Sequence, residues 1–256
     1  MTNKSLGQHW LRDRTILEEI AAQGRLGPED TVLEIGPGPG GLTSLLLAQA
    51  GRVVSVEFDP EVARKLPGQF PGKNLEVVQG DILEYDLGKL PSGYKVVANI
   101  PYYITKKIIQ NFVRAANQPE VMVLLVQQEV AQKYAAAAGD LTLQAVELQL
   151  AYDVHVSTRV PKTYFNPVPA VDSQVLVCTK IHVDKNAYVD NKSILRVARA
   201  GFASPRKKLR TTLSSGLGIS RELVEASLRQ IGASPDVRAQ DLSVADWAKL
   251  ADILAA

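Results

Sequence analysis

The fold is decided by the stretch Thr31-Val-Leu-Glu-Ile-Gly-Pro-Gly-Pro-Gly-Gly-Leu-Thr43. Residues 31–35 have the composition of a buried strand, and they run through a glycine-rich turn into a helix-like stretch at 42–50. Glycines let the backbone turn tightly and approach a ligand without an intervening Cβ atom. Because the following helix directs its free N–H groups toward the same point, the stretch predicts a nucleotide-type cofactor beside Gly36, Gly38 and Gly40.

Short β-rich runs alternate with helix-like runs over the first 180 residues. This alternation is typical of βαβ units and predicts an α/β fold with a mostly parallel, doubly wound sheet. The expected strands are residues 31–35, 52–57, 75–79, 95–98 and 121–127, and the expected helices are 42–50, 61–69 and 105–116. Two later β-rich runs, near 146–156 and 174–183, are expected to pair antiparallel beside this sheet.

The pattern changes to helical spacing after residue 183. The expected helices are 194–202, 206–215, 221–231 and 244–254, with Ser220 and Ser243 as N-caps. We therefore predict two domains: residues 1–183, which carry the sheet, and residues 184–256, which are all helical.

Composition excludes several classes of protein. The chain has 256 residues, 46% hydrophobic and 22% charged, which is typical of a globular protein and not of a disordered one. One cysteine, Cys178, allows neither an internal disulfide nor a cysteine-based zinc site, and no spaced set of metal ligands is present. Without a secretory signal or a run long enough to span a bilayer, the chain is expected to be cytoplasmic and not to bind membranes. We also expect a monomer that holds no metal.

Basic residues are concentrated in one part of the chain. Residues 192–210 contain seven Lys or Arg and no acidic residue, although the whole chain has a net charge of only +2. Such a block predicts contact with a polyanion at Arg206, Lys207, Lys208 and Arg210.

Two acidic residues follow the second and third strands. The glycine pattern alone also satisfies the dinucleotide motif G-x-G-x-x-G, and a carboxylate at Glu57 would bind a ribose diol in either kind of cofactor. Gly80-Asp81-Ile82 adds a second acid, at a strand end where it would contact the adenine of a compact nucleoside. Acids at both strand ends favour S-adenosylmethionine over NAD.

Asn99-Ile100-Pro101-Tyr102 follows the fourth strand. Ligands bind beyond the carboxyl ends of the strands in doubly wound sheets, so this segment is expected at the reactive end of the cofactor. The amino group of adenine is a poor nucleophile, because its lone pair is delocalised into the ring. The Asn99 amide oxygen and the Ile100 carbonyl would each accept one of its N–H bonds, Pro101 would fix the turn, and Tyr102 would stack on the base.

These motifs resemble those of the ribosomal RNA adenine N6-dimethyltransferases of the small-subunit type. Ser5-Leu-Gly-Gln-His-Trp-Leu11 is similar to the family's S-L-G-Q-N-F-L, and Phe165-Asn-Pro-Val-Pro-Ala-Val-Asp-Ser173 to its F-x-P-x-P-x-V-D-S. Phe202–Leu213 is similar to its F-x-x-R-R-K-x-L-x-N-x-L segment. The chain departs from the family at His9 and Trp10, which replace Asn and Phe, and at residues 134–143, a shortened loop that lacks an arginine.

The resemblance implies a Rossmann-like S-adenosylmethionine-dependent methyltransferase domain followed by a helical RNA-binding domain. Its substrate would be two adjacent adenosines near the 3′ end of small-subunit rRNA, which gives the enzyme a role in ribosome biogenesis. It adds Phe165 as a second stacking partner for the flipped adenine. The cofactor contacts that it implies are His9, Leu11, Gly36, Glu57, Asp81 and Asn99.

Two other functions stay open on the sequence. One is a large-subunit rRNA adenine methyltransferase of the antibiotic-resistance type, against which the 202–213 segment argues. The other is a non-catalytic RNA-binding factor in ribosome assembly, which the intact Asn99, Glu57 and Asp81 disfavour. A nicotinamide-dependent dehydrogenase is less well supported still, because no hydride-transfer constellation is present.

Overall fold

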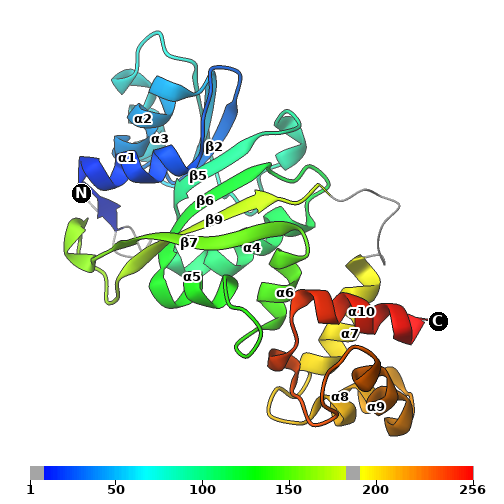
Figure 1. Cartoon of the computed structure of the whole chain (residues 1–256). Coiled ribbons are helices and arrows are strands. Elements are labelled where there is room, and N and C mark those ends of the chain that lie inside the picture. The colour runs from blue at the N-terminus through cyan, green and yellow to red at the C-terminus, as the bar shows by residue number, and fades with distance from the viewer. Residues whose placement is uncertain (1–8, 183–190, 256) are drawn as a thin grey trace. The chain divides into compact units, whose positions relative to one another are not determined.

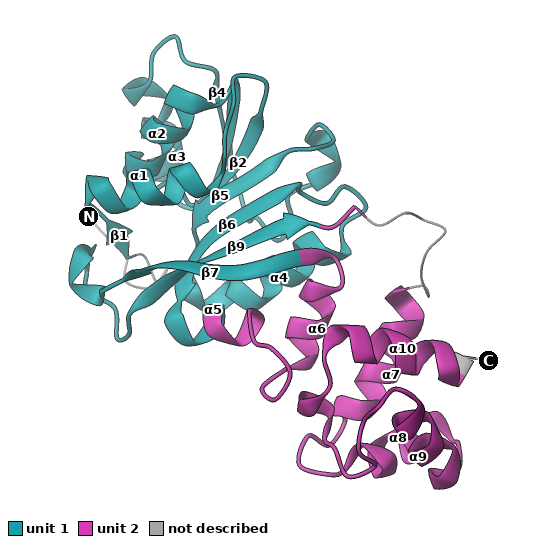
Figure 2. Cartoon of the chain, viewed as in Figure 1, with its two compact units in different colours: residues 1–131, 153–180 teal, residues 132–152, 181–256 magenta. Residues whose placement is uncertain are grey.

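The computed structural model describes residues 9–182 and 191–255 (Figure 1). The chain divides into two compact units, shown in Figure 2. The first unit comprises residues 1–131 and 153–180, and the helical unit comprises residues 132–152 and 181–256.

A seven-stranded sheet forms the centre of the first unit, in the order β4-β3-β2-β5-β6-β9-β7. The pairs from β4 to β6 are parallel, and β9 pairs antiparallel with β6. The strands are β2 (Thr31–Ile35), β3 (Arg52–Glu57), β4 (Leu75–Gln79), β5 (Lys95–Asn99), β6 (Val121–Gln127), β7 (Tyr152–Val160) and β9 (Ser173–Lys180). The predicted α/β fold with a mostly parallel, doubly wound sheet is confirmed.

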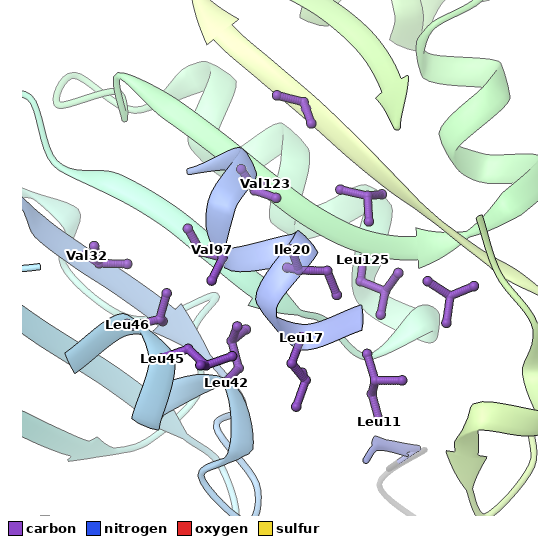
Figure 3. Packing of buried hydrophobic residues seen from close by; sticks show 14 of the residues in the cluster. Leu11, Leu17, Ile20, Val32, Leu42, Leu45, Leu46, Val97, Val123 and Leu125 are labelled. Atoms are coloured by element: carbon purple, nitrogen blue, oxygen red, sulfur yellow. The ribbon is translucent and has the colours of Figure 1, made fainter. Parts of the chain in front are cut away.

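Helices α1 (Arg14–Gln23) and α2 (Gly41–Gln49) cover one face of this sheet. Helix α1 begins at the N-cap Asp13, whose side chain accepts a hydrogen bond from the Ile16 amide. Figure 3 shows its buried residue Ile20 beside Val97 and Leu125 of the sheet, and Leu17 belongs to the same buried cluster. The alternate residues of the same strands are also buried, which explains why these strands read as continuous apolar runs.

The remaining helices of the first unit follow individual strands. They are α3 (Pro60–Lys65) after β3, α4 (Thr105–Arg114) after β5 and α5 (Gln128–Tyr134) after β6, with short 3₁₀ turns at Pro67–Gln69, Leu87–Lys89, Tyr102–Ile104 and Lys162–Tyr164. Residues 61–69, predicted as one helix, are therefore divided between α3 and a 3₁₀ turn. The last residues of α5 belong to the helical unit.

The strand order reverses at β2. Going along the chain, the sheet first grows from β2 through β3 to β4, and then from the other side of β2 through β5 to β6. Such a reversal leaves a crevice beyond the carboxyl ends of the two central strands, β2 and β5. Residues that follow these strands therefore meet at one place.

A separate two-stranded sheet joins the start of the described chain to a segment far along it. Strand β1 (Trp10–Leu11) pairs antiparallel with β8 (Phe165–Asn166), and Leu11 lies opposite Phe165. Both side chains are buried in the same apolar cluster as α1 and α2. This pairing holds residues 9–11 beside the large sheet.

The helical unit has its own apolar core around Trp247, which is fully buried with Leu209 and Leu250. Its helices are α6 (Leu143–Gln149), α7 (Asn191–Phe202), α8 (Leu209–Leu217), α9 (Arg221–Gln230) and α10 (Val244–Ala255). Ser220 caps α9 by accepting a hydrogen bond from the Leu223 amide. Ser243 accepts one from the Asp246 amide, so both predicted N-caps are present.

The structure differs from the sequence prediction at residues 132–152. The β-rich run expected near 146–156 begins with a helix, α6, and the strand β7 starts only at Tyr152. Thr142 caps α6 through the Ala145 amide, and Ala145 and Val146 are buried in the helical core. This packing assigns residues 132–152 to the helical unit, whereas the sequence placed them in the first domain. The predicted boundary between residues 183 and 184 falls outside the described residues; the two units divide between Lys180 and Ile181.

Candidate active site

A cavity of about 280 Å³ lies at the crevice between the ends of β2 and β5. Its volume is near the lower end of the range for small-molecule sites, about 300–1,000 Å³. Residues that follow four neighbouring strands line it together: Gly36 and Gly38, Glu57, Asp81 and Ile82, and Asn99 to Tyr102. The structure thus brings most of the predicted cofactor and catalytic residues to one site.

Glu57 ends β3, and its carboxylate faces the glycine turn. One oxygen accepts a hydrogen bond from the Gly38 amide at 3.3 Å, and the other accepts one from the Asp59 amide at 2.9 Å. Burial raises the pKa of Glu57 above its ordinary value of 4.5, and these two amide donors oppose that rise. A carboxylate oriented by backbone amides at a strand end is suited to accept hydrogen bonds from a diol.

A second glutamate, Glu34, lies beneath the site on β2 and is 1% exposed. Thr43 and Ser55 each donate a hydroxyl hydrogen bond of 2.8 Å to its Oε2 atom. Among the described residues, Oε1 has no hydrogen-bond partner. Burial is the main cause that raises the pKa of Glu34 from 4.5 to about 7.

The three glycines predicted to lie beside the cofactor have different surroundings. Gly36, at φ 62°, lines the cavity, and a Cβ atom there would project into open space. At Gly38, φ 52°, a Cβ atom would lie 3.1 Å from the Trp10 ring. Gly40 does not line the cavity; it lies at the N-cap of α2 against Leu66 and Phe70.

Asp81 and Ile82 line the cavity at the end of β4, as predicted. The Asp81 carboxylate accepts a hydrogen bond from the Leu83 amide at 2.9 Å. This bond orients the acid while leaving its other oxygen available. The Ile82 side chain is buried and supplies apolar surface beside it.

Asn99 is the last residue of β5, and its side-chain amide has one fixed orientation. Its Nδ2 atom donates a hydrogen bond of 3.1 Å to the backbone carbonyl of His9. The amide oxygen is therefore the end left for an acceptor role. Tyr102, three residues later, is held by a hydrogen bond of 2.6 Å between its hydroxyl and that of Ser173.

His9 lines the same cavity and contacts two other segments. Its ring stacks on the Tyr102 ring with centroids 5.7 Å apart and an interplanar angle of 19°. Its Nδ1 atom lies 2.8 Å from the Pro167 carbonyl oxygen. His9 thus occupies the predicted region, and both its ring and its carbonyl touch the catalytic motif. Ser5 to Gln8 of the quoted motif fall outside the described residues.

Besides Gly40, two further predicted site residues, Leu11 and Phe165, do not line this cavity. Leu11 lies at a neighbouring cavity of about 30 Å³, which it shares with Glu34, Gly36 and Asn99. Phe165 is 3% exposed and packs in the apolar core. Its ring is covered in this structure, whereas a stacking partner for a base needs an accessible face.

The predicted basic block lies in the helical unit, and its four residues have different environments. Helix α8 begins at Leu209 and not at 206, so Arg206 and Lys207 lie in the exposed turn before it. Lys208 pairs with Asp236 at 2.8 Å, and Arg210 pairs with Glu225 and Asp236 at 3.1 and 3.2 Å. Intramolecular carboxylates therefore partly neutralise half of the block.

The shortened loop predicted at 134–143 is attached to another segment of the helical unit. The Gly139 amide donates to the Gln240 carbonyl at 2.8 Å, and the Gln240 side chain donates back to the Gly139 carbonyl at 2.7 Å. Gln240 lies in the 3₁₀ turn Ala239–Asp241. The loop is held in place by this pair of bonds.

Sequence reasoning missed several cavity residues, chiefly Trp10, Phe58, Tyr103 and Lys107. Phe58 is 55% exposed and Tyr103 is 67% exposed. Exposed side chains do not contribute to a hydrophobic pattern in the sequence, so that pattern could not indicate them. They could have been found as neighbours of predicted site residues, since Phe58 directly follows Glu57 and Tyr103 directly follows Tyr102.

Within residues 9–182 and 191–255, no group of His, Cys, Asp and Glu is arranged to hold a metal ion. No helix in the described part of the chain is long and apolar enough to cross a membrane.

The reversed strand order, the glycine turn and the strand-end acids together define an α/β enzyme of the Rossmann-like methyltransferase class. The chain belongs to the ribosomal RNA adenine dimethylase family, whose model matches residues 1–256.

Curated relatives carry the name ribosomal RNA small subunit methyltransferase A. The chain is 39% identical to the relative from Dehalococcoides mccartyi strain CBDB1, covering 96% of this chain and 86% of the relative. It is 37% identical to the relative from Thermosynechococcus vestitus, covering 98% and 96%.

Solved structures share the fold. The 23S rRNA methyltransferase ErmE superposes with a TM-score of 0.83 at 27% identity, over 96% of this chain and all of that one. A dimethyladenosine transferase from Plasmodium falciparum gives a TM-score of 0.80 at 23% identity, over 94% and 96%, and is similar in fold.

Proposed function

We propose that this protein transfers methyl groups from S-adenosylmethionine to the N6 atoms of two adjacent adenosines near the 3′ end of small-subunit rRNA. The observation that carries the proposal is the shared cavity of Asn99, Tyr102, Glu57 and Asp81. Glu57 and Asp81 suit a nucleoside cofactor, while the Asn99 amide and the Tyr102 ring suit a flipped base. Their presence in one cavity suits transfer of a methyl group from that cofactor to that base.

The residues present fit S-adenosylmethionine. Glu57 would accept hydrogen bonds from the ribose hydroxyls, and Asp81 and Ile82 would bind the adenine. At Gly36 the open space where a Cβ atom would stand leaves room for the cofactor at the backbone. When bound, S-adenosylmethionine supplies an electrophilic methyl group.

The chain's own residues would orient and polarise the acceptor amine. With its Nδ2 atom bonded to His9, Asn99 presents its amide oxygen to one N–H of adenine N6. The Ile100 carbonyl accepts the other N–H, which turns the nitrogen lone pair out of the ring plane. Pro101 fixes the turn, and Tyr102, fixed through Ser173, stacks on the base. Positioning of this kind needs no strong base.

The choice of the small-subunit substrate rests on sequence similarity. The fold is shared with ErmE, a 23S rRNA methyltransferase, so the fold does not separate the two substrates. Identity reaches 39% with a relative named for the small subunit and is 27% with ErmE. A ribosomal substrate is consistent with the cytoplasmic location and the monomeric state that we expect.

RNA phosphates would contact the turn that precedes α8. Arg206 and Lys207 are exposed, and neither forms an ion pair within the described residues. Lys208 and Arg210 would have to exchange their carboxylate partners for phosphates, so their contribution to RNA affinity is expected to be smaller.

The test is methyl transfer from isotopically labelled S-adenosylmethionine to undermethylated small subunits, large subunits and naked rRNA. We expect label on small-subunit adenines alone, and its loss in Asn99→Ala, in which methyl transfer should fall far more than S-adenosylhomocysteine affinity does. Label on large subunits would indicate the resistance-type activity. Cofactor binding without label on any acceptor would favour a non-catalytic assembly factor.

A further inference from the structure

Two consecutive tyrosines at the mouth of the cavity differ in their surroundings. Tyr102 is half-buried, and its hydroxyl is bonded to Ser173. Tyr103 lines the same cavity but is 67% exposed. No hydrogen bond of the Tyr103 side chain occurs within the described residues. The ring is therefore free to accept a stacking partner from solution.

Positive charge accompanies this ring. Lys107, on the first turn of α4, lines the same cavity, and Lys106 beside it is also exposed. Neither lysine forms an ion pair in the part of the chain that the structure describes. Residues 99–119 contain no acidic residue, so nothing on this segment neutralises them. An exposed ring beside free ammonium groups has the chemistry of a single-stranded nucleic-acid site.

The place of this ring in the sheet favours the substrate over the nucleoside end of the cofactor as its partner. The acids that suit a nucleoside cofactor follow β3 and β4, whereas Tyr103 follows β5, on the other side of β2 in the sheet. Tyr103 is instead the direct neighbour of Tyr102, on which the target base would stack.

A base that leaves its strand to enter a cavity deprives the next base of a stacking partner. We propose that Tyr103 and Lys107 form a subsite for the nucleotide next to the target adenosine. Its base stacks on Tyr103, and its phosphate pairs with Lys107. The inference rests on the proposed function, because it requires a flipped adenine at Tyr102.

The subsite would fix the position of the strand and not its sequence, since every base offers a face to an aromatic ring. That tolerance suits a substrate in which the neighbouring nucleotide is itself an adenosine, before or after its own methylation. The same contact would then be used in each of the methyl transfers.

The experiment compares Tyr103→Ala, Tyr103→Trp and Lys107→Gln in the full chain. The matched control is Tyr164→Ala, since Tyr164 is 43% exposed and does not line the cavity. Affinity for undermethylated small subunits is measured in the presence of S-adenosylhomocysteine, so that no turnover is needed. KM and kcat are then measured with labelled S-adenosylmethionine.

We expect Tyr103→Ala to weaken affinity and raise KM about tenfold, as loss of one base–aromatic stack does. Tyr103→Trp should restore both values, because a larger ring offers the same stacking face. Lys107→Gln should lower the slope of log affinity against log salt by about 0.7, the value for one phosphate on a single strand. Affinity for S-adenosylhomocysteine should change less than twofold.

Equal affinities for Tyr103→Ala and Tyr164→Ala would overturn the subsite. A loss of S-adenosylhomocysteine affinity in Tyr103→Ala would also overturn it, since the ring would then belong to the cofactor site. Failure of the wild-type protein to label small subunits would instead count against the proposed function. The binding comparison gives its answer without that activity.

Discussion

The carboxyl group of Glu34 is expected to make the stability of this fold depend on pH. It is 1% exposed, and its Oε1 atom has no hydrogen-bond partner among the described residues. Burial, the largest cause, raises its pKa from 4.5 to about 7, although Thr43 and Ser55 oppose the rise. The folded state therefore holds this proton more tightly than the unfolded chain does.

The sign and size of the effect follow from this difference. Below pH 4.5 Glu34 is protonated in both states, and its contribution to stability is fully present. As pH rises from 4.5 to about 7, the unfolded chain ionises first, so the folded state loses stability. With about 1.4 kcal/mol for each pKa unit, the total loss is about 3 kcal/mol.

The variant Glu34→Gln removes this titration. Its amide oxygen can still accept the two hydroxyl hydrogen bonds, while its NH₂ group stands where the unpartnered oxygen was. Burying these NH₂ donors without partners lowers the stability of the variant by about 1–3 kcal/mol. The cost does not depend on pH, so the readout is the difference between wild type and variant as a function of pH.

Urea unfolding at pH 5, 6, 7 and 8, followed by Trp10 fluorescence in a Trp247→Phe background, measures this difference for the first unit. Wild-type stability should fall relative to the variant by about 2.5 kcal/mol between pH 5 and pH 8, since part of the total is already lost at pH 5. Glu29→Gln, which changes an exposed glutamate, is the control and should leave the pH dependence unchanged. A wild-type to variant difference that is the same at pH 5 and pH 8 would refute the reasoning.

Three further predictions concern the site and the RNA contact. Glu57→Gln should weaken S-adenosylhomocysteine binding at least tenfold, because the ionised carboxylate accepts hydrogen bonds from both ribose hydroxyls. For the same reason, the affinity of the wild-type protein should fall as the pH drops through the raised pKa of Glu57. A pH-independent affinity, measured by calorimetry, would contradict this prediction. Gly38→Ala should lower the free energy of unfolding by about 1 kcal/mol more than Gly72→Ala does, because both glycines have positive φ but only Gly38 lies against Trp10. Equal urea midpoints for the two variants would count against this prediction. Arg206→Ala should weaken small-subunit binding more than Arg210→Ala, which already pairs with Glu225, and filter binding giving the reverse order would be inconsistent with it.

The sequence predicted the central strands of the sheet well because they are buried on both faces. Residues 31–35, 52–57 and 121–127 match β2, β3 and β6, and their apolar runs leave few alternative structures. Residues 75–79 also match β4, although this edge strand has no buried residue. The helix α6 was missed because Val146 and Leu148 resemble strand residues when read alone. Its burial against the helical core, a contact between distant segments, decides its structure.

The site was predictable where topology determines it. Because the strand order reverses at β2, the residues that end β2 and β5 must lie at the same crevice. Gly36 and Asn99 could therefore be assigned to one site from the sequence. The buried position of Phe165 and the exposed position of Tyr103 depend on tertiary packing. The carboxylate partners of Lys208 and Arg210 come from residues 225 and 236, which the charge pattern alone does not link to them.

The short pairing of β1 with β8 has a practical consequence for anyone who shortens this protein. A chain that starts at Trp10 would keep β1, every strand of the seven-stranded sheet and the whole helical core. It would lose the His9 carbonyl that fixes the Asn99 amide and the ring that stacks on Tyr102. Trimming a few residues from the front of the chain would thus leave a folded molecule whose key asparagine rotates freely, and circular dichroism or gel filtration would give no warning of the damage.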